Sequence, residues 1–213
     1  MSGAAVDVAP SKILCVGRNY RAHAAEMGSD VPAQPLLFLK PPSALLPSGD
    51  AIVLPPQSAR VEFEGEIAVI LGRPLRNASE AEARSALSHV VALNDVTARD
   101  LQRSDGQWTR AKGFDTFCPV GAPVPVEEVD LEALQVVTTV NGVERQRGAV
   151  GQMVFSIPFV LAYASSVMTL LPGDLITTGT PEGVGPLSPG DVVRVEIPGV
   201  SHVENPVVVG AGS

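Results

Sequence analysis

The sequence predicts an α+β fold that is mainly β, in which a few short helices flank mixed strands. Short apolar segments rich in Val, Ile and Leu outnumber the helical patterns. The helices do not alternate regularly with these segments, which disfavours a doubly wound parallel sheet. Hydrophobic residues make up 45% of the chain and charged residues 18%, which is typical of a packed globular protein.

The N-terminal part predicts one strand and one helix. Residues 12–17, KILCVG, are apolar after Lys12 and read as a short buried strand. Residues 19–28 read as a short helix, in which Asn19 is suited to cap the first turn and Gly28 to end the helix in a left-handed conformation. A proline-rich, extended stretch follows.

The middle of the chain predicts two strands separated by a helix. Residues 61–72 first alternate polar and apolar side chains and then become wholly apolar, which indicates a long strand entering the core. Ser79 and Glu82 have the spacing of a capping box that opens a helix through Leu87. Residues 90–96 predict another buried strand.

The C-terminal part predicts a hairpin, one longer helix and several short strands. In residues 134–148, β-branched strands flank Asn141 and Gly142, which form a two-residue turn signal. Residues 155–170 predict a helix. The short strands after it are separated by Pro-Gly turns.

The organisation predicted is a flexible N-terminal tail, residues 1–11, followed by a single domain, residues 12–213, since no linker divides the chain. The N-terminus lacks the pattern of a signal peptide, and no apolar run is long enough to cross a membrane. Cys15 and Cys118 belong to no CxxC pair, which favours reduced core thiols. We therefore expect a cytoplasmic protein that does not associate with membranes.

The formal net charge of −8 disfavours a broad basic face for nucleic acid.

Glu62, Glu64 and Glu66 alternate along one predicted strand, so their side chains are expected on one face. Asp95 lies where a later apolar strand turns polar. A solvent-facing acidic edge and a divalent-metal site both remain open from these residues. A glycosidase pair is disfavoured, because that chemistry needs carboxylates on opposite sides of a sugar bond.

His23 and Glu26 are three residues apart on the predicted helix and thus share a face. A glutamate that accepts a hydrogen bond from one ring nitrogen leaves the other nitrogen free to activate water, although such pairs are also common on exposed helices. Lys112 is a candidate substrate ligand or a solvent-facing residue. Arg99 and Gln102 follow Asp95 closely and are candidates for the same site.

Another candidate is the Gly- and Thr-rich segment at residues 178–185, which has no nucleotide-binding pattern. Its backbone N–H groups and the Thr180 hydroxyl could bind a carboxylate.

Six segments carry a resemblance to a known family. They are CVGRNYRAHAAEMG, LLFLKPPSAL, VEFEGEIAVILG, NDVTARDLQ, DGQWTRAKGFDTFCPVG and TLLPGDLITTGTPEGVGP, and they occur in this order. Together they resemble the fumarylacetoacetate hydrolase family in its short single-domain form. The resemblance covers nearly everything from Lys12 to Val209 and implies a mainly β roll with short flanking helices, usually as a homodimer.

The resemblance also implies roles for the candidate residues. Glu64, Glu66 and Asp95 correspond to a metal triad for Mg²⁺, with Mn²⁺ or Ca²⁺ as alternatives, whereas Glu62 stays outside it. The catalytic pair falls on His23 and Glu26, in a lid, and the substrate-binding lysine on Lys112. Further substrate-binding positions correspond to Arg99, Gln102 and Thr180.

The activity expected from the resemblance is metal-dependent cleavage of a C–C bond in a small 2-oxo or 2,4-dioxo acid, as in an acylpyruvate hydrolase. An oxaloacetate-type decarboxylase and a 2-hydroxyhepta-2,4-diene-1,7-dioate isomerase/decarboxylase of aromatic catabolism remain alternatives. An alternative of another class is a non-catalytic, metal-stabilised β-protein dimer.

Overall fold

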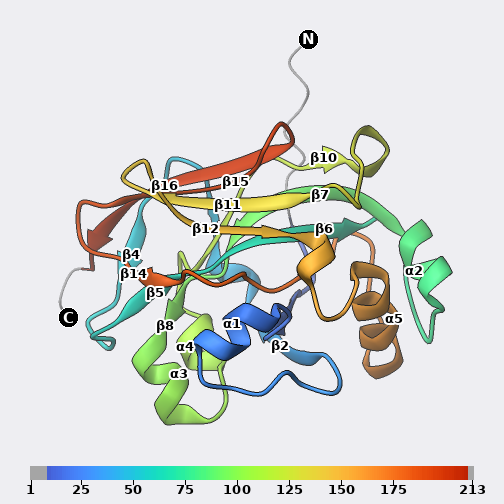
Figure 1. Ribbon diagram of the computed structural model, residues 1–213, viewed down its shortest axis with the longest axis horizontal. Helices are drawn as coiled ribbons and strands as arrows, with labels where there is room; N and C mark the ends of the chain where they lie inside the picture. The colour runs from blue at the N-terminus through green and yellow to red at the C-terminus, as the bar shows by residue number, and fades with distance from the viewer. Residues whose placement is uncertain (1–8, 211–213) are drawn as a thin grey trace.

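Residues 9–210 are described by the computed structural model, in which three β-sheets form the framework (Figure 1). The largest sheet has eight strands in the order β2-β1-β13-β6-β7-β9-β3, with β10 paired to β7. Its strands are β1 (Ile13–Gly17), β2 (Leu36–Lys40), β3 (Leu45–Pro47), β6 (Gly65–Leu71), β7 (Leu87–Asn94), β9 (Cys118–Val120), β10 (Val124–Pro125) and β13 (Leu175–Thr177).

A five-stranded sheet covers one face of the largest sheet, and a three-stranded sheet lies at its end (Figure 1). The five-stranded sheet has the order β12-β11-β15-β16-β4, and the three-stranded sheet the order β14-β5-β8. Their strands are β4 (Ile52–Leu54), β5 (Val61–Phe63), β8 (Thr97–Ala98), β11 (Gln135–Val140), β12 (Val143–Ala149), β14 (Gly185–Pro186), β15 (Val192–Ile197) and β16 (Ser201–Val209).

Five short α-helices flank the sheets in the described part of the chain. They are α1 (Arg21–Glu26), α2 (Glu80–Ser85), α3 (Arg99–Asp105), α4 (Thr109–Lys112) and α5 (Ile157–Val167), with single 3₁₀ turns at Pro42–Ala44, Val126–Glu128 and Val150–Gln152. Most strand pairs are antiparallel; β1–β13, β3–β9 and β4–β16 are parallel. This architecture confirms the predicted α+β, mainly β fold.

The apolar core lies on both faces of β6. Ile67, Val69 and Leu71 pack toward the five-stranded sheet and α5. Ala68 and Ile70 face the other way, toward a second cluster that includes both cysteines. Because side chains alternate along a strand, Glu66 lies on the same face as Ala68 and Ile70. This places a carboxylate at the edge of a buried apolar layer.

The predicted strand at residues 61–72 is interrupted at Glu64. β5 pairs with β8 and β14, whereas β6 pairs with β7 and β13, so the chain passes from one sheet to another at this residue. The Glu64 carbonyl accepts a hydrogen bond from the Asp95 N–H (2.8 Å), and its own N–H donates to Asn94 Oδ1 (2.9 Å). The prediction of one continuous strand was therefore wrong at this point.

The predicted helix at residues 19–28 is shorter than expected. α1 begins after Tyr20, and Asn19 does not cap it. The Asn19 side chain instead donates to the carbonyl oxygens of Phe155 (3.0 Å) and Thr178 (2.8 Å), and it accepts from the Phe155 N–H. These long-range bonds fasten the start of α1 to the rest of the fold. Gly28 has a φ of 63°, as predicted for the residue that ends the helix.

Other local predictions are confirmed. The Ser79–Glu82 capping box opens α2. β11 and β12 form the predicted hairpin, with φ values of 52° and 76° at Asn141 and Gly142. No helix among residues 9–210 is long and apolar enough to cross a membrane. Most of the predicted tail, residues 1–8, lies outside the described residues.

Candidate functional site

Three carboxylates meet where β6 begins and β7 ends. The two strands pair antiparallel, with Glu66 opposite Leu93, so the start of one strand lies beside the end of the other. Glu64 precedes β6, Glu66 is its second residue, and Asp95 follows β7 directly. Oxygen atoms of the three carboxylates lie within 4.8 Å of one another, and all three side chains are buried. The structure thus brings together the three residues predicted as a triad.

Two buried lysines bind Asp95 on its two oxygens. Lys112, the last residue of α4, donates to Asp95 Oδ2 (2.7 Å) and to Glu64 Oε2 (2.8 Å). Lys40, the last residue of β2, donates to Asp95 Oδ1 (2.6 Å) and to the Val96 carbonyl oxygen (3.2 Å). Charged groups of this kind are tolerated in a protein interior only when they are paired.

Arg99, the first residue of α3, links the triad to Glu62. It binds Glu64, and its Nε donates to Glu62 Oε2 (2.7 Å). Glu62 also accepts from the half-exposed Arg60 (2.5 Å). Glu62 is therefore buried behind Arg99 and stays outside the triad; the alternative of a solvent-facing acidic edge is wrong. Arg99 Nη1 also donates to Gln102 Oε1 (2.5 Å), which leaves the Gln102 amide N–H groups for other partners.

The two glutamates of the triad differ in their electrostatics. Burial by itself raises the pKa of Glu64, but Lys112 and Arg99 outweigh it and hold this pKa far below its usual range. Burial raises the pKa of Glu66 well above its usual range, and the Asp95 and Glu64 carboxylates raise it further. A divalent cation would relieve this repulsion, and a set of carboxylate oxygens suits Mg²⁺ or Mn²⁺ better than Zn²⁺. The triad could therefore bind a metal ion.

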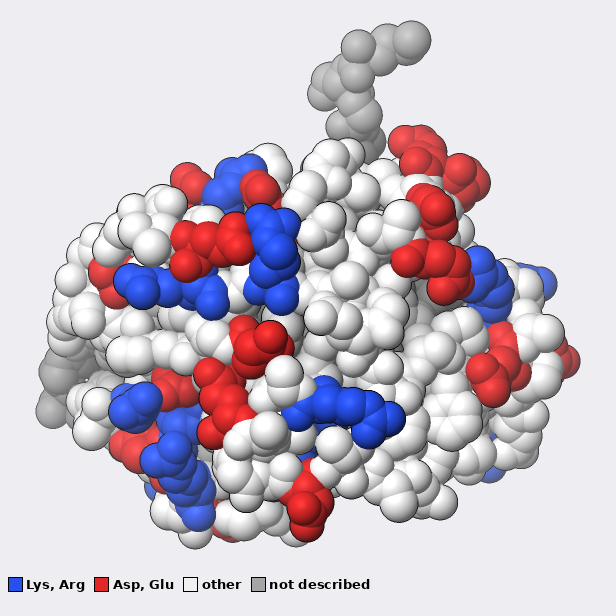
Figure 2. Space-filling model, viewed as in Figure 1, with Lys and Arg blue, Asp and Glu red and all other residues white. Residues whose placement is uncertain are grey.

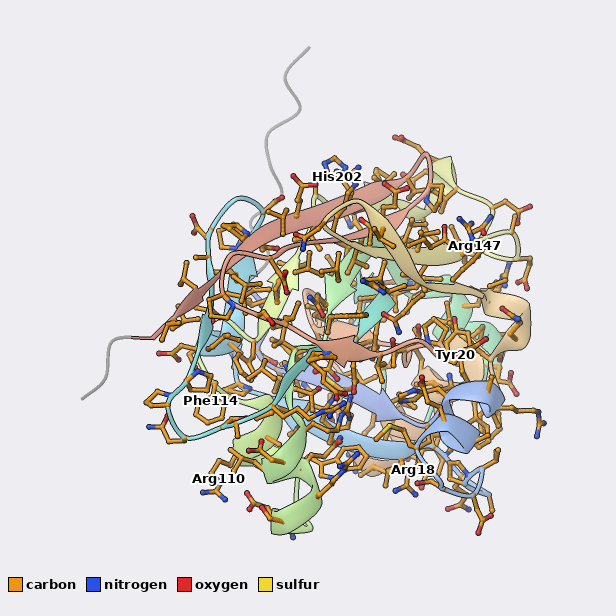
Figure 3. The ribbon with its side chains drawn as sticks, turned by 60° about the vertical axis from the view of Figure 1, so that its left-hand side comes forward. Arg18, Tyr20, Arg110, Phe114, Arg147 and His202 are labelled. Carbon is orange, nitrogen blue, oxygen red and sulfur yellow. The ribbon has the colours of Figure 1, made fainter. Side chains whose placement is uncertain are left out.

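The predicted catalytic pair lies on α1, beside the triad. His23 Nδ1 is 3.2 Å from Glu26 Oε2, and the His23 side chain is buried. Glu26 in turn accepts from the Gly183 N–H at 3.0 and 3.2 Å, which joins α1 to the glycine-rich segment at residues 178–185. With Glu26 ionised, Nδ1 carries the proton and Nε2 is left as an acceptor. His202, by contrast, lies on the outer side of β16 (Figure 3).

Thr180 lines the site, but its hydroxyl is committed to the protein. Thr180 Oγ1 donates to the Gly65 carbonyl oxygen (2.8 Å) and accepts from Gln146 Nε2 (2.8 Å). Gln146 is buried on β12, and its Oε1 accepts from the Gly65 N–H (2.9 Å). The Thr180 hydroxyl would have to give up Gly65 before it could donate to a substrate. In this structure it instead fixes the backbone between Glu64 and Glu66.

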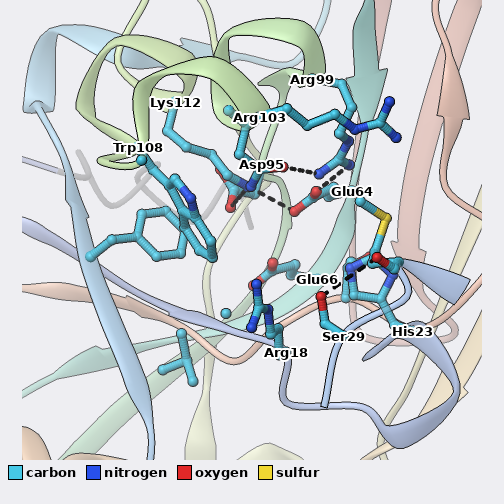
Figure 4. Close-up of a pocket in the computed structure, with 17 residues that line it drawn as sticks. Arg18, His23, Ser29, Glu64, Glu66, Asp95, Arg99, Arg103, Trp108 and Lys112 are labelled. Carbon is cyan, nitrogen blue, oxygen red and sulfur yellow. Dashed lines mark hydrogen bonds and ion pairs between the residues drawn. The ribbon is translucent and has the colours of Figure 1, made fainter. Parts of the chain in front are cut away.

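A pocket of about 340 Å³ opens over the triad (Figure 4). Its wall combines the predicted site residues with apolar and basic side chains. The lining residues are Val16, Gly17, Arg18, His23, Met27, Ser29, Phe38, Glu64, Glu66, Asp95, Arg99, Gln102, Arg103, Gly106, Trp108, Lys112 and Thr180. Phe38 and Trp108 form an edge-to-face pair with ring centroids 5.1 Å apart, and Lys112 Nζ lies 5.1 Å from the Phe38 centroid.

Sequence reasoning missed four residues around this site: Lys40, Gln146, Arg18 and Arg103. One of them gave a usable signal, because Lys40 is a lone cation at the end of the apolar run Leu36–Lys40 and has to find a buried partner there. Arg18 and Arg103 lie close in sequence to the predicted residues His23 and Gln102, but nothing in their types or spacing marks them as site residues, and Gln146 reaches the site from a distant strand.

Comparisons with known proteins agree with this architecture. Residues 12–208 match the family described as fumarylacetoacetate (FAA) hydrolase C-terminal. An uncharacterised protein of Methanocaldococcus jannaschii is 46% identical over 93% of this chain and 84% of its own length. The mitochondrial oxaloacetate tautomerase FAHD1 of Arabidopsis thaliana is 42% identical over 91% of this chain and 89% of its own length.

A solved structure of similar fold comes from Mycobacterium smegmatis. This 5-carboxymethyl-2-hydroxymuconate delta-isomerase is 45% identical to the chain, with a TM-score of 0.88 over 95% of this chain and 80% of that one. Sequence, fold and the buried carboxylate site therefore lead to one conclusion: the chain belongs to the fumarylacetoacetate hydrolase family of enzymes.

Proposed function

We propose that the protein cleaves a C–C bond in a small 2-oxo or 2,4-dioxo acid with the help of a divalent cation, Mg²⁺ or Mn²⁺. The observation that carries this proposal is the buried triad at the floor of the pocket, with Lys112 beside it and His23 on α1. A cation held by Glu64, Glu66 and Asp95 would chelate the 2-oxo acid head and stabilise the enolate that forms when the bond breaks.

The chain's own residues then bind and orient the substrate. An ammonium group has three N–H donors, and Lys112 uses two of them on Glu64 and Asp95. Its third donor is available to a substrate oxygen in the pocket. Gln102, whose carbonyl is held by Arg99, offers its amide N–H groups in the same way. Phe38 and Trp108 form an apolar part of the pocket wall.

Hydrolysis of an acylpyruvate-type substrate is our first choice of reaction. His23 Nε2 takes a proton from water, whose oxygen attacks the C4 carbonyl; the C3–C4 bond breaks and its electron pair passes to C3 as an enolate. The proton held by His23 can then be returned to C3. Glu26 fixes the ring and stabilises its charged form. A simple decarboxylase would have less use for a base that activates water.

A second candidate is proton transfer at C3, as in an isomerase or tautomerase. The names of the Arabidopsis and M. smegmatis relatives favour it. In this reaction His23 Nε2 takes a proton from C3, which leaves the enolate of the intact substrate, and returns that proton to another carbon or to the enolate oxygen; no C–C bond breaks and no water attacks. Decarboxylation of oxaloacetate instead breaks the C3–C4 bond, releases C4 as CO₂ and leaves the same pyruvate enolate as hydrolysis, without any nucleophile.

Purified protein with Mg²⁺, assayed against acetylpyruvate and oxaloacetate, tests the proposal. We expect acetylpyruvate to yield pyruvate and acetate, and chelation to abolish the reaction. Turnover of oxaloacetate alone would favour decarboxylation, and enol–keto exchange without cleavage would favour a tautomerase.

The variants His23→Ala and Glu66→Ala distinguish an enzyme from a metal-stabilised β-protein. As an enzyme, folded His23→Ala loses at least a hundredfold in kcat, since general base catalysis contributes on the order of 10²–10⁴-fold. As a structural protein, only Glu66→Ala would change a measurable property, the melting temperature with metal.

A further inference from the structure

Gln146 is a buried polar side chain on an otherwise exposed stretch of β12. Its relative exposure is 1%, whereas the residues on either side of it are exposed. Its Oε1 accepts from the Gly65 N–H (2.9 Å), and its Nε2 donates to Thr180 Oγ1 and to the Pro181 carbonyl oxygen (both 2.8 Å). A side-chain amide has two N–H groups, so both are used. These bonds offset the cost of burying an amide, and they lead to two different parts of the site.

One end of the Gln146 amide holds the peptide between the two glutamates of the triad. The Gly65 N–H donates to Gln146 Oε1, and the Gly65 carbonyl oxygen accepts from Thr180 Oγ1 (2.8 Å). Because that hydroxyl accepts in turn from Gln146 Nε2, the three residues form a closed ring of hydrogen bonds. A rotation of the Gly65 peptide groups would turn the Glu64 and Glu66 carboxylates relative to each other. The ring therefore fixes the geometry of two candidate metal ligands.

The other end of the amide holds the glycine-rich segment at residues 178–185. Two residues after Pro181, the Gly183 N–H donates to Glu26 at 3.0 and 3.2 Å. Gly183 lies directly against β12: its φ is 95°, and a β-carbon there would be 2.1 Å from the Arg145 carbonyl oxygen. Close backbone contact and the hydrogen bond to Pro181 thus hold the segment on β12, and the segment places one N–H beside the acidic member of the pair on α1.

A β-bulge lies immediately before Gln146 in the β11–β12 hairpin. Thr138 pairs with Gln146 and Thr139 with Glu144, so Arg145 has no partner of its own on β11. Such an extra residue bends the strand, and bulges are frequent next to active sites, where they redirect a side chain. The extra residue is also the one whose carbonyl oxygen lies against the glycine-rich segment. The irregular point of the hairpin thus coincides with its contact to the site.

We propose that Gln146 is a positioning residue, which holds the carboxylate triad and the His23–Glu26 pair in a fixed relation to each other. The inference rests on the proposed function, since that function gives the triad and the pair their roles. Gln146 lies behind the pocket wall and acts through two backbone groups, at Gly65 and at Pro181. A misplacement of about 1 Å can lower a rate by about a hundredfold, so a residue that touches no substrate can still control the reaction.

The variant Gln146→Met tests both contacts together. Methionine has a similar length and volume but no amide, so the Gly65 N–H and the Pro181 carbonyl oxygen lose their partner. We expect the Mn²⁺ dissociation constant, measured by electron paramagnetic resonance, to rise on the order of ten- to a hundredfold, as is usual when a group behind the ligands is removed. Turnover of acetylpyruvate at saturating Mg²⁺ should fall by a similar factor. Amide hydrogen exchange in residues 178–185, measured by mass spectrometry, should become faster.

The variant Gln146→Glu separates the two contacts. Its side chain keeps an oxygen for the Gly65 N–H but has at most one O–H donor in place of two N–H donors. We expect Mn²⁺ to bind at least as tightly as in the unmodified protein, because the Gly65 peptide stays held and any negative charge added there attracts the cation. Hydrogen exchange in residues 178–185 should still become faster, and turnover should still fall.

Gln135→Met is the matched control. Gln135 lies on β11 in the same hairpin, but its side chain accepts from Arg147 at the surface (3.0 Å). Mn²⁺ affinity, turnover and hydrogen exchange in residues 178–185 should all stay unchanged in this variant.

A folded Gln146→Met protein with unchanged Mn²⁺ affinity and turnover would overturn the proposal, even with a lower melting temperature, since Gln146 would then only pack the core. A loss on one side alone would overturn it as well, because one side chain would not hold both groups. If Gln146→Met does not fold, unchanged turnover and exchange in Gln146→Glu is the overturning result. The proposed function fails differently, in the unmodified protein, which would then not bind Mn²⁺ or not turn over acetylpyruvate. Exchange in residues 178–185 of the variants would still decide whether Gln146 holds this segment.

Discussion

Lys40 fixes the orientation of Asp95. Its ammonium holds Oδ1 at 2.6 Å and so directs Oδ2 toward Lys112 and the pocket. In Lys40→Met, Asp95 is left with an unpaired buried oxygen, which costs about 3–5 kcal/mol in comparable buried pairs. We expect this variant to bind Mn²⁺ more weakly, as measured by electron paramagnetic resonance. Removing a nearby positive charge would by itself have the opposite effect and strengthen Mn²⁺ binding.

Whether Lys40→Met binds Mn²⁺ more weakly or more tightly than the unmodified protein decides whether Lys40 orients Asp95 or only repels the cation. Lys12→Met is a matched control, because Lys12 pairs with another buried carboxylate, Asp174, away from the triad. It should leave Mn²⁺ affinity unchanged. Tighter Mn²⁺ binding by Lys40→Met would show that Lys40 acts only as a repelling charge.

Gly65 lies between two triad residues because no side chain fits there. A β-carbon at this position would be 1.9 Å from Thr138 Oγ1 and 3.2 Å from a Val195 methyl. Gly65→Ala must therefore shift β6, and we expect a loss of about 1–3 kcal/mol in the free energy of unfolding, together with weaker Mn²⁺ binding. Chemical denaturation and metal titration measure the two effects.

The double variant Gly65→Ala/Thr138→Ala tests this cause. It removes the hydroxyl that would clash, a buried group with no partner in the described structure. We expect it to recover part of both losses. If the double variant is no better than Gly65→Ala alone, the clash with Thr138 is not the reason for the glycine.

At the scale of elements, a buried carboxylate fastens β1 to the turn before β13. Asp174 accepts from Ser11 Oγ (2.6 Å), from Lys12 Nζ (2.5 Å) and from the Leu171 N–H (2.7 Å). Burial tends to raise the pKa of Asp174, but these hydrogen bonds outweigh it and lower the pKa below its ordinary value of 3.8. A lowered pKa in the folded state stabilises the protein above the unfolded-state pKa.

The pH dependence of stability checks this assignment. Asp174→Asn should reduce the free energy of unfolding near neutral pH. The difference from the unmodified protein should shrink as the pH falls below about 4, where Asp174 becomes protonated. Asp50→Asn, at an exposed loop carboxylate, serves as the control and should change little at any pH. A difference that grows on acidification would contradict the assignment.

At the scale of the whole molecule, we propose that the protein is a homodimer, as its family resemblance implies. Acidic and basic side chains are interspersed over the face shown in Figure 2. Exposed apolar residues, in contrast, occur near the outer strand of the large sheet, where Leu36, Leu39 and Val167 line a groove of about 700 Å³. Light scattering should give twice the chain mass of 22.1 kDa. Leu39→Glu should shift this mass toward the monomer, and a monomeric unmodified protein would refute the dimer.

Local sequence determined those features that depend on neighbouring residues. The Asn141–Gly142 turn and the Ser79–Glu82 capping box formed as predicted, since each is decided within a few residues. The order of the six segments sufficed for the family, and it pointed to Glu64, Glu66 and Asp95, whose carboxylates the structure brings within 4.8 Å of one another.

Only the tertiary structure decided what the buried groups contact. It broke the strand at Glu64, sent Asn19 to Phe155 instead of α1, and buried Glu62 behind Arg99. It also brought Lys40 to Asp95 across 55 positions of the sequence. Contacts between distant segments override the local patterns of strand alternation and helix capping. The reason is that each buried charged or polar group needs a partner, and the fold can supply that partner from anywhere in the chain. Strand spacing by itself left Glu62, Glu64 and Glu66 equivalent, and the structure shows why they differ: Glu62 is bound by Arg99, whereas Glu64 and Glu66 lie together with Asp95.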